Sequence, residues 1–260
     1  MITRSDIMLI DTHVHLNNEA LYEDVENYIK KAQNENVTRF IVIGYNPEMN
    51  EKAIALAEKY DFVYASVGMH PTYVKDHKSS DIELFVKQLD HKKVVAVGEC
   101  GLDYHWDKDN KTDQKRIFER QIELSKALDL PLSIHMRDAT EDTYEVLKRY
   151  APLKGIMHCY SGSKEFASKF LELGLHISLG GPVTFKNAKV PKDVAKLVPL
   201  DKLLIETDAP FLAPHPHRGK QNDSSYLPLI AQAIAGLKEV SFETIATHTT
   251  KNAKTLFNLE

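Results

Sequence analysis

The feature that most constrains this chain is an alternation, repeated eight times, between short apolar runs and longer connecting stretches. The apolar runs end in Gly, Pro or polar residues and span residues 7–16, 38–45, 62–71, 93–103, 130–139, 155–162, 175–181 and 202–210. Runs that are apolar almost throughout are typical of parallel strands, because both faces of such strands are buried. The sequence therefore predicts eight parallel strands.

Most connecting stretches have the length and apolar spacing of amphipathic helices. In residues 22–36 the spacing predicts a buried stripe of Val25, Ile29 and Ala32. In residues 113–130 the predicted stripe, which Pro131 stops, is Ile117, Ile122, Leu124 and Leu128. Eight strand–helix units close a (β/α)8 barrel of about 250 residues. We therefore predict a single TIM-barrel domain over residues 1–260, with residues 1–7 as a polar lead-in and a doubly wound open sheet as the alternative.

Composition excludes several classes of protein. No segment approaches the ~18 uninterrupted apolar residues of a membrane span, and the first residues lack the apolar core of a signal peptide. The chain has two cysteines, which fits a reducing cytoplasm better than a secreted disulfide scaffold. Its net charge of −4 disfavours broad electrostatic attraction to nucleic acid. We expect a cytoplasmic monomer with no membrane partner, and interpret the basic segment Lys186–Lys196 as a solvated loop and helix face.

Candidate metal ligands follow the predicted strands. The motif "DTHVHL" ends the first run with His13 and His15, which strand alternation places on one face. The other candidates come from the fourth, fifth, sixth and eighth runs: Glu99, His135, His158 and Asp208. Glu206 also ends the eighth run, two residues before Asp208. The carboxyl ends of barrel strands converge on one mouth, where active sites of this fold are built. A buried polar role remains the alternative for each residue taken singly.

Four imidazoles and two carboxylates exceed what one tetrahedral ion binds, and they suit two cations that share a carboxylate. Glu99, on a middle strand, is the predicted bridge. His13, His15 and Asp208 are expected to bind one ion, because the first and eighth strands are neighbours in a closed barrel. The second ion is assigned to His135 and His158. Such ligands accept Zn²⁺, Mn²⁺ or Mg²⁺, and the sequence does not choose among them.

Other polar residues near the predicted mouth have open roles. Asp208 is also the candidate acceptor of a proton from water activated between the ions. Glu206 either orients a ligand, contacts substrate or supports a neighbouring histidine. His70 is either a loop histidine or a contact for phosphate, and Arg137 and Arg218 are phosphate contacts or rim ion pairs.

Aromatic residues and cysteines near the same mouth are assigned more modest roles. If DNA is the substrate, its single-stranded ends are expected to enter a narrow mouth. Tyr104, Trp106 and Tyr160 would then be stacking platforms, or else rim packing. Cys100 and Cys159 each follow a predicted ligand, so we expect both to point away from the barrel axis as packing residues.

The ordered motifs "DTHVHL", "VGMHP", "GECGLDY", "IHMRDA", "HCYSG", "VTFKNA", "ETDAPFLAP" and "HRGK" resemble the TatD family of metal-dependent deoxyribonucleases over nearly the whole chain. The resemblance implies a TIM barrel, two divalent cations and hydrolysis of DNA phosphodiester bonds, often as a 3′ to 5′ exonuclease. It also implies a set of metal ligands, namely His13, His15, Glu99, His135, His158 and Asp208. In such proteins the counterparts of His70 and Glu206 lie at the substrate site.

Two departures from the family pattern stand out. Cys100 replaces a common Ile, and Gln221, Asn222, Asp223 and Ser224 replace an Arg-Asn-Glu-Pro run, so grip on the substrate near the mouth is expected to differ. The alternative functions are a barrel hydrolase that cuts a C–N or C–O bond, a PHP-type phosphoesterase with seven strands, and a metal-stabilised scaffold that binds without turnover. Glu99 stands where many two-metal amidohydrolases have a modified lysine, which disfavours that subclass.

Overall fold

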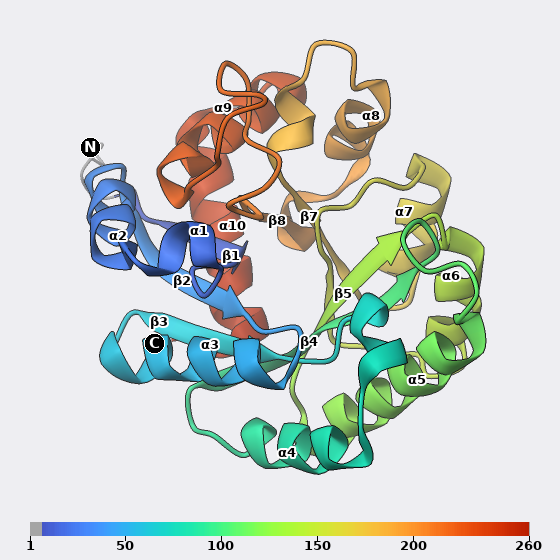
Figure 1. Ribbon diagram of the computed structural model, residues 1–260. Coiled ribbons are helices and arrows are strands. Elements are labelled where there is room, and N and C mark those ends of the chain that lie inside the picture. The colour runs from blue at the N-terminus through green and yellow to red at the C-terminus, as the bar shows by residue number, and fades with distance from the viewer. Residues whose placement is uncertain (1–6, 260) are drawn as a thin grey trace.

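The computed structural model describes residues 7–259 and contains eight parallel strands in consecutive order (Figure 1). The strands are β1 (Leu9–Val14), β2 (Val37–Ile43), β3 (Val63–Val67), β4 (Val94–Asp103), β5 (Leu132–Arg137), β6 (Gly155–Met157), β7 (His176–Leu179) and β8 (Leu203–Ile205). Each strand overlaps one of the eight predicted runs. The predicted single-domain (β/α)8 TIM barrel is confirmed.

Helices surround the strands and connect them (Figure 1). They are α1 (Glu19–Tyr22), α2 (Val25–Asn34), α3 (Pro47–Lys59), α4 (Ser79–Leu89), α5 (Lys111–Leu128), α6 (Thr140–Lys148), α7 (Lys164–Glu172), α8 (Lys189–Leu197), α9 (Leu227–Lys238) and α10 (Phe242–Phe257). Short 3₁₀ helices lie in the loops: η2 (Pro71–Asp76), η3 (Gly181–Thr184), η4 (Leu200–Lys202) and η5 (Ser224–Tyr226).

The predicted helix stripes are largely correct. Val25, Ile29 and Ala32 of α2 are buried, as the spacing predicted. Leu128 is the exception, because it is the last residue of α5 and is 42% exposed. Ile7 is buried in the core, so the polar lead-in does not extend to this residue, and residues 1–6 lie outside the described part of the chain.

Hydrogen bonds from the end of β1 and His15 to the end of β8 and the residues after it close the barrel. The hydroxyl of Thr12 donates to the carbonyl oxygen of Ile205 (2.9 Å), and the amide of Asp208 donates to the carbonyl oxygen of His13 (2.9 Å). The amide of His15 donates to the carbonyl oxygen of Ala209 (2.8 Å). These bonds tie the two ends of the sheet together at its mouth, so that residues far apart in the sequence share one site.

The core has two parts that follow strand alternation. In β2, Phe40 and Val42 belong to the large cluster between strands and helices, whereas Ile41 and Ile43 point to the opposite face. The inner cluster also contains Leu256 and Phe257 of α10. Apolar side chains therefore fill the barrel below the mouth, and the end of the last helix packs against them. Within residues 7–259, no helix is long and apolar enough to cross a membrane.

Candidate metal centre

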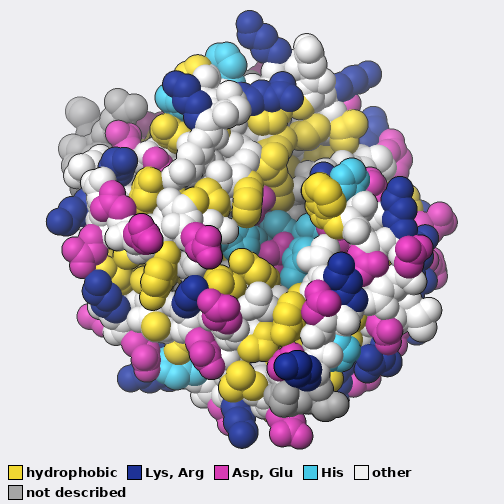
Figure 2. Space-filling view, in the orientation of Figure 1, with side chains coloured by type: hydrophobic (Ala, Val, Ile, Leu, Met, Phe, Trp, Pro, Cys, Tyr) yellow, Lys and Arg dark blue, Asp and Glu magenta, His cyan; other side chains and the backbone are white. Residues whose placement is uncertain are grey.

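The predicted ligands surround the floor of a cavity of about 700 Å³ at the carboxyl ends of the strands. Figure 2 shows histidine side chains at the bottom of this hollow, with hydrophobic side chains along its border. All six predicted ligands come together there: His13, His15, Glu99, His135, His158 and Asp208. Five of them are at most 9% exposed, and His135 is partly exposed.

A break in the register of β4 aims Glu99 into the barrel. The pairing with β5 shifts between Val97 and Cys100, and Glu99 lies inside this irregularity. Gly98 and Gly101 flank it with φ values of +147° and +138°, which L side chains rarely adopt. Such bulges commonly redirect a side chain next to an active site. Glu99 therefore sits in the middle of its strand rather than at the end, where the sequence placed it.

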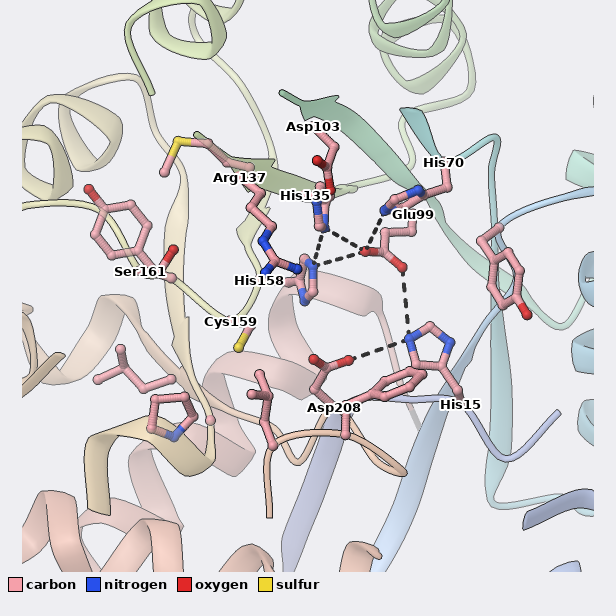
Figure 3. A pocket seen from close by; sticks show the side chains of 18 of the residues that line it. His15, His70, Glu99, Asp103, His135, Arg137, His158, Cys159, Ser161 and Asp208 are labelled. Atoms are coloured by element: carbon pink, nitrogen blue, oxygen red, sulfur yellow. Dashed lines mark hydrogen bonds and ion pairs between the residues drawn. The ribbon is translucent and has the colours of Figure 1, made fainter. Parts of the chain in front are cut away.

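The two carboxylate oxygens of Glu99 face two different groups of ligands (Figure 3). Its Oε1 lies 3.0 Å from Nδ1 of His135 and 3.0 Å from Nε2 of His158. Its Oε2 lies 3.7 Å from Nε2 of His13 and 3.8 Å from Nε2 of His15. Glu99 thus occupies the central position between the two predicted ion sites.

Asp208 completes the group formed by the β1 histidines. Its Oδ1 lies 3.4 Å from Nε2 of His15 and 3.8 Å from Nε2 of His13. The backbone of Asp208 has a φ of +56°, which is a left-handed conformation that residues other than glycine rarely adopt. This turn directly after β8 directs the carboxylate back over the mouth of the barrel.

The ring nitrogens that face away from Glu99 are held by other groups. Nδ1 of His13, in β1, lies 3.3 Å from the hydroxyl of Ser133, and Nδ1 of His15, just after β1, lies 3.3 Å from the carbonyl oxygen of Ile43. Contacts of this kind fix the orientation of a ligating histidine and leave its other nitrogen free for a metal.

Carboxylates hold the two histidines on the other side. Nε2 of His135 lies 3.0 Å from Oδ2 of Asp103, and Nδ1 of His158 lies 3.2 Å from Oε1 of Glu206. Glu206 is fully buried and does not line the cavity, so the structure places it beneath His158 rather than beside a substrate. Of the three roles left open for Glu206, the geometry favours support of this histidine.

The protonation states of His13 and Glu99 suit metal binding. Burial lowers the pKa of His13 well below its ordinary value, and His158 lowers it further, which leaves the ring neutral. Burial opposes ionisation of Glu99, but the Coulombic attraction of His158 and the hydrogen bonds from His135 and His158 outweigh it and hold the pKa of the carboxyl well below its usual range. Nε2 of His13 is buried without a hydrogen-bond partner among residues 7–259. A neutral imidazole with an unpartnered buried nitrogen beside a carboxylate fits a divalent cation.

His70 and Arg137 line the cavity, whereas Arg218 lies outside it. Nδ1 of His70 accepts from the amide of Thr72 (3.2 Å), and its Nε2 faces Oε1 of Glu99 at 3.5 Å. His70 thus caps a loop and also faces the predicted ions. Burial lowers its pKa to about 3, so its ring is neutral. Arg137 lies over the ring of Trp106 at 5.3 Å.

The prediction for the two cysteines is half correct. Cys100 is fully buried, but Cys159 is partly exposed and lines the cavity. The chain leaves β6 at Met157, and Cys159 adopts a φ of +39°, so strand alternation no longer sets its direction. Burial raises the pKa of the Cys159 thiol well above its ordinary value, which keeps it protonated and a poor nucleophile.

The three candidate aromatic platforms differ in exposure. Trp106 is 68% exposed and lines the cavity, so it is available for stacking. Tyr160 lines the cavity but is buried, and its hydroxyl donates to the carbonyl oxygen of Ser163 (2.8 Å). Tyr104 is buried, donates to Asp142 (2.7 Å) and does not line the cavity.

Sequence reasoning missed Asp103, although this residue ends the fourth predicted run, residues 93–103. Its Oδ1 accepts from the amides of His105 and Trp106 (both 2.9 Å), which leaves Oδ2 for His135. The available signal was position, because β4 continues to this residue and so carries a second carboxylate to the mouth. Asp103 therefore joins the site as a positioning residue.

The segment that departs from the family pattern is also placed by the structure. Ser224 donates to the buried carboxylate of Asp11 (2.7 Å), and Gln221 donates to the hydroxyl of Tyr28 (2.8 Å). Neither residue lines the cavity. These residues hold the long loop after β8 against the barrel.

Comparison with known proteins places this fold and site in a family. A family model described as TatD related DNase matches residues 10–258. The chain is 50% identical over 255 residues to the uncharacterized metal-dependent hydrolase YabD of Bacillus subtilis. The match covers 97% of this chain and 100% of that protein. It is 36% identical over 259 residues to the uncharacterized metal-dependent hydrolase YcfH of Escherichia coli K12, with 98% and 97% covered.

Solved structures agree with these relationships. The crystal structure of YjjV, a TatD homologue from Escherichia coli K12, superposes with a TM-score of 0.93 at 33% identity, and the match covers 100% of both chains. A TatD family hydrolase from Entamoeba histolytica shares the fold with a TM-score of 0.86 at 21% identity, over 97% of this chain and 99% of that one. The chain therefore belongs to the TatD-related DNase family and is a metal-dependent hydrolase.

Proposed function

We propose that this protein is a deoxyribonuclease that hydrolyses phosphodiester bonds at single-stranded DNA ends, as a 3′ to 5′ exonuclease with two divalent cations. The observation that carries the proposal is the central position of Glu99, whose two oxygens face two separate groups of nitrogen donors. Paired cations that share a carboxylate are suited to in-line displacement at phosphorus. The family to which the chain belongs supports DNA as the substrate class.

Six residues would hold the cations, namely His13, His15, Asp208, His135, His158 and Glu99 as the shared ligand. Bound there, Zn²⁺, Mn²⁺ or Mg²⁺ would lower the pKa of a water molecule and neutralise charge on the phosphate oxygens. Asp208, which lines the cavity, would accept the proton of that water. Arg137, also in the wall, would bind a non-bridging phosphate oxygen, and neutral His70 would contact the phosphate or its leaving group.

The size of the cavity favours single-stranded ends over duplex DNA. About 700 Å³ is within the range of roughly 300–1,000 Å³ that pockets for small ligands span. Such a space accepts a terminal nucleotide, and a double helix is too wide to enter it. The exposed Trp106 at the edge of the cavity supports this preference, since unpaired bases stack on aromatic rings.

Hydrolysis of labelled single-stranded DNA tests the proposal. Protein treated with a chelator is expected to be inactive, and return of Mg²⁺, Mn²⁺ or Zn²⁺ should restore stepwise shortening of a 5′-labelled strand. A 3′-labelled strand should release labelled mononucleotide first. Asp208→Asn, which removes a predicted ligand and proton acceptor, should abolish both signals and so exclude a contaminating nuclease.

Intact DNA under every metal, in protein that still holds two ions, would overturn the proposal and leave hydrolysis of a C–N or C–O bond as the alternative. The eight observed strands disfavour a PHP-type phosphoesterase, for which seven were expected. A cytoplasmic location and a monomeric state stay predictions.

A further inference from the structure

One side of the cavity is apolar and lies beside the metal centre. Pro182, Val183, Pro191, Phe211 and Leu212 form this surface, here called the apolar wall. Phe211 and Leu212 are 51% and 45% exposed, although large apolar side chains are usually buried. The ring of Phe211 lies 5.9 Å from that of His15, so the wall begins directly at the ligands.

Hydrogen bonds and close packing fix the apolar wall. The side-chain amide of the buried Asn222 donates to the carbonyl oxygen of Phe211 (2.6 Å). The amide of His215 donates to the hydroxyl of Thr184 (2.8 Å), which joins the loop after β8 to η3. The exposed position of Phe211 is therefore built into the fold, as expected of a surface that awaits a ligand.

Three cationic side chains lie on the segments next to the apolar wall. The guanidinium of Arg218 lies 4.4 Å from the ring of Phe185, and Nζ of Lys192 donates to the carbonyl oxygen of Lys186 (2.9 Å). We call Lys186, Lys192 and Arg218 the basic lip. Lys192 directly follows Pro191 of the wall, so the two surfaces are continuous. Figure 2 shows Lys and Arg side chains gathered above the hollow.

The charges of the basic lip are available to a ligand. Within residues 7–259, none of its three side chains lies within 4.0 Å of a carboxylate in a salt bridge. Among the described residues that line the cavity, Arg137 is the only lysine or arginine. A polyanion longer than the terminal nucleotide would therefore meet its next positive charges at the lip.

We propose that the DNA strand leaves the metal centre across the apolar wall, where its bases stack on Phe211, and continues over the basic lip, which binds its phosphates. Proteins that hold single strands commonly combine aromatic platforms with a positively charged path. This inference rests on the proposed nuclease function and adds to it a path outside the cavity. It also assigns Arg218 to the strand beyond the reacting phosphate, and the segment Lys186–Lys196 to more than a solvated surface.

Binding of oligothymidylates of 2, 4, 8 and 12 nucleotides tests this path. Their phosphorothioate linkages resist hydrolysis, and binding to the metal-loaded protein is followed by fluorescence anisotropy. In the natural protein, affinity should rise with length and then level off. In the Lys186→Gln, Lys192→Gln, Arg218→Gln triple variant, affinity for the 12-mer should fall about tenfold or more at low salt. The slope of log K against log salt should become shallower by about 2, since each lost phosphate contact contributes about 0.7.

The matched control is Lys30→Gln, Lys87→Gln, Lys251→Gln, which removes the same charge from exposed lysines of α2, α4 and α10. Equal losses in both triple variants, or an unchanged salt slope in the lip variant, would overturn the path. Hydrolysis of a dinucleotide, too short to reach the lip, should be the same in all three proteins. If the natural protein cleaves no single-stranded DNA of any length under any of the three metals, the proposed chemistry fails, while the binding series still decides the path.

Discussion

At the scale of single residues, the site depends on groups that hold the ligands as well as on the ligands themselves. Each of the four histidines predicted to bind metal places its second nitrogen against a different partner, and two of these partners are the carboxylates Asp103 and Glu206. A carboxylate behind a histidine fixes the ring and strengthens its basicity. Metal affinity should therefore respond to residues that touch no ion.

Asp103→Asn tests that dependence. The carboxylate accepts from two backbone amides with one oxygen and faces His135 with the other. An amide has a single accepting oxygen, so it cannot serve both sides. We expect the affinity for one of the two ions to fall roughly 10- to 100-fold. Titration calorimetry of the metal-free protein measures the change.

Asp138→Asn is the control for this substitution. Asp138 also contacts a histidine of the rim, with 3.0 Å between its Oδ2 and Nδ1 of His105, but it is exposed and does not line the cavity. Its replacement should leave both ion affinities unchanged. Equal affinities in Asp103→Asn and the natural protein would show that His135 needs no support.

At the scale of elements, the sequence predicts most of the fold and much of the site. Eight apolar runs predict eight strands because parallel strands are buried on both faces. Alternation also predicts that His13 and His15 lie together, and the structure places their rings 5.1 Å apart, with His13 in β1 and His15 just after it. Alternation fails where the chain leaves regular structure, at the bulge around Glu99 and at Cys159 after β6. The position of Asp103 at the end of β4 could be predicted, but its contact with His135 could not, because it depends on how the two side chains meet across neighbouring strands.

The loops after β7 and β8 are in close contact at Gly181. A Cβ atom at this position would lie 1.9 Å from the carbonyl oxygen of Leu212, so Gly181→Ala must displace the backbone that carries the apolar wall. We expect destabilisation by about 1–3 kcal/mol and a lower melting temperature. Gly236→Ala in α9 is the matched control, because a Cβ atom added at this position would meet no neighbouring atom within 4 Å. This substitution should stabilise the protein by about 0.5–1 kcal/mol. Thermal melts of both variants measure these changes. An unchanged Tm for Gly181→Ala would contradict the close contact.

His176, the first residue of β7, is expected to make the stability of the fold depend on pH. Burial lowers the pKa of His176 to about 4, with a further contribution from Lys202, against 6.5 for an ordinary histidine. Between these pH values the unfolded chain binds a proton that the folded chain does not. This histidine therefore contributes stability that is present above pH 6.5 and is lost as the pH falls toward 4.

His176→Phe removes the titrating group and should flatten that part of the profile. Urea unfolding of both proteins between pH 4 and pH 7 isolates the difference, since the remaining titrating groups are common to both. Parallel profiles would contradict the lowered pKa.

At the scale of the whole molecule, the barrel collects ligands from distant parts of the sequence. His13 and Asp208 are neighbours in space because the ends of the sheet are joined by hydrogen bonds. The unfolded chain does not keep this arrangement. Cations that bind the folded state alone should therefore stabilise the entire barrel.

Removal of the metal tests this coupling. Protein treated with a chelator should melt at a lower temperature than metal-loaded protein, because a ligand at 100 times its Kd contributes about 2.7 kcal/mol. Asp208→Asn should show a smaller difference between the two states. Differential scanning calorimetry measures both shifts. Identical melting temperatures with and without metal would show that metal binding does not stabilise the fold.

The central claim is that this cavity holds two cations with Glu99 between them. Anomalous diffraction from crystals of the protein loaded with Mn²⁺ measures this directly. We expect two peaks roughly 3.5–4 Å apart, one beside His13, His15 and Asp208 and the other beside His135 and His158. A single peak, or peaks that leave Glu99 without contact to both ions, would contradict it.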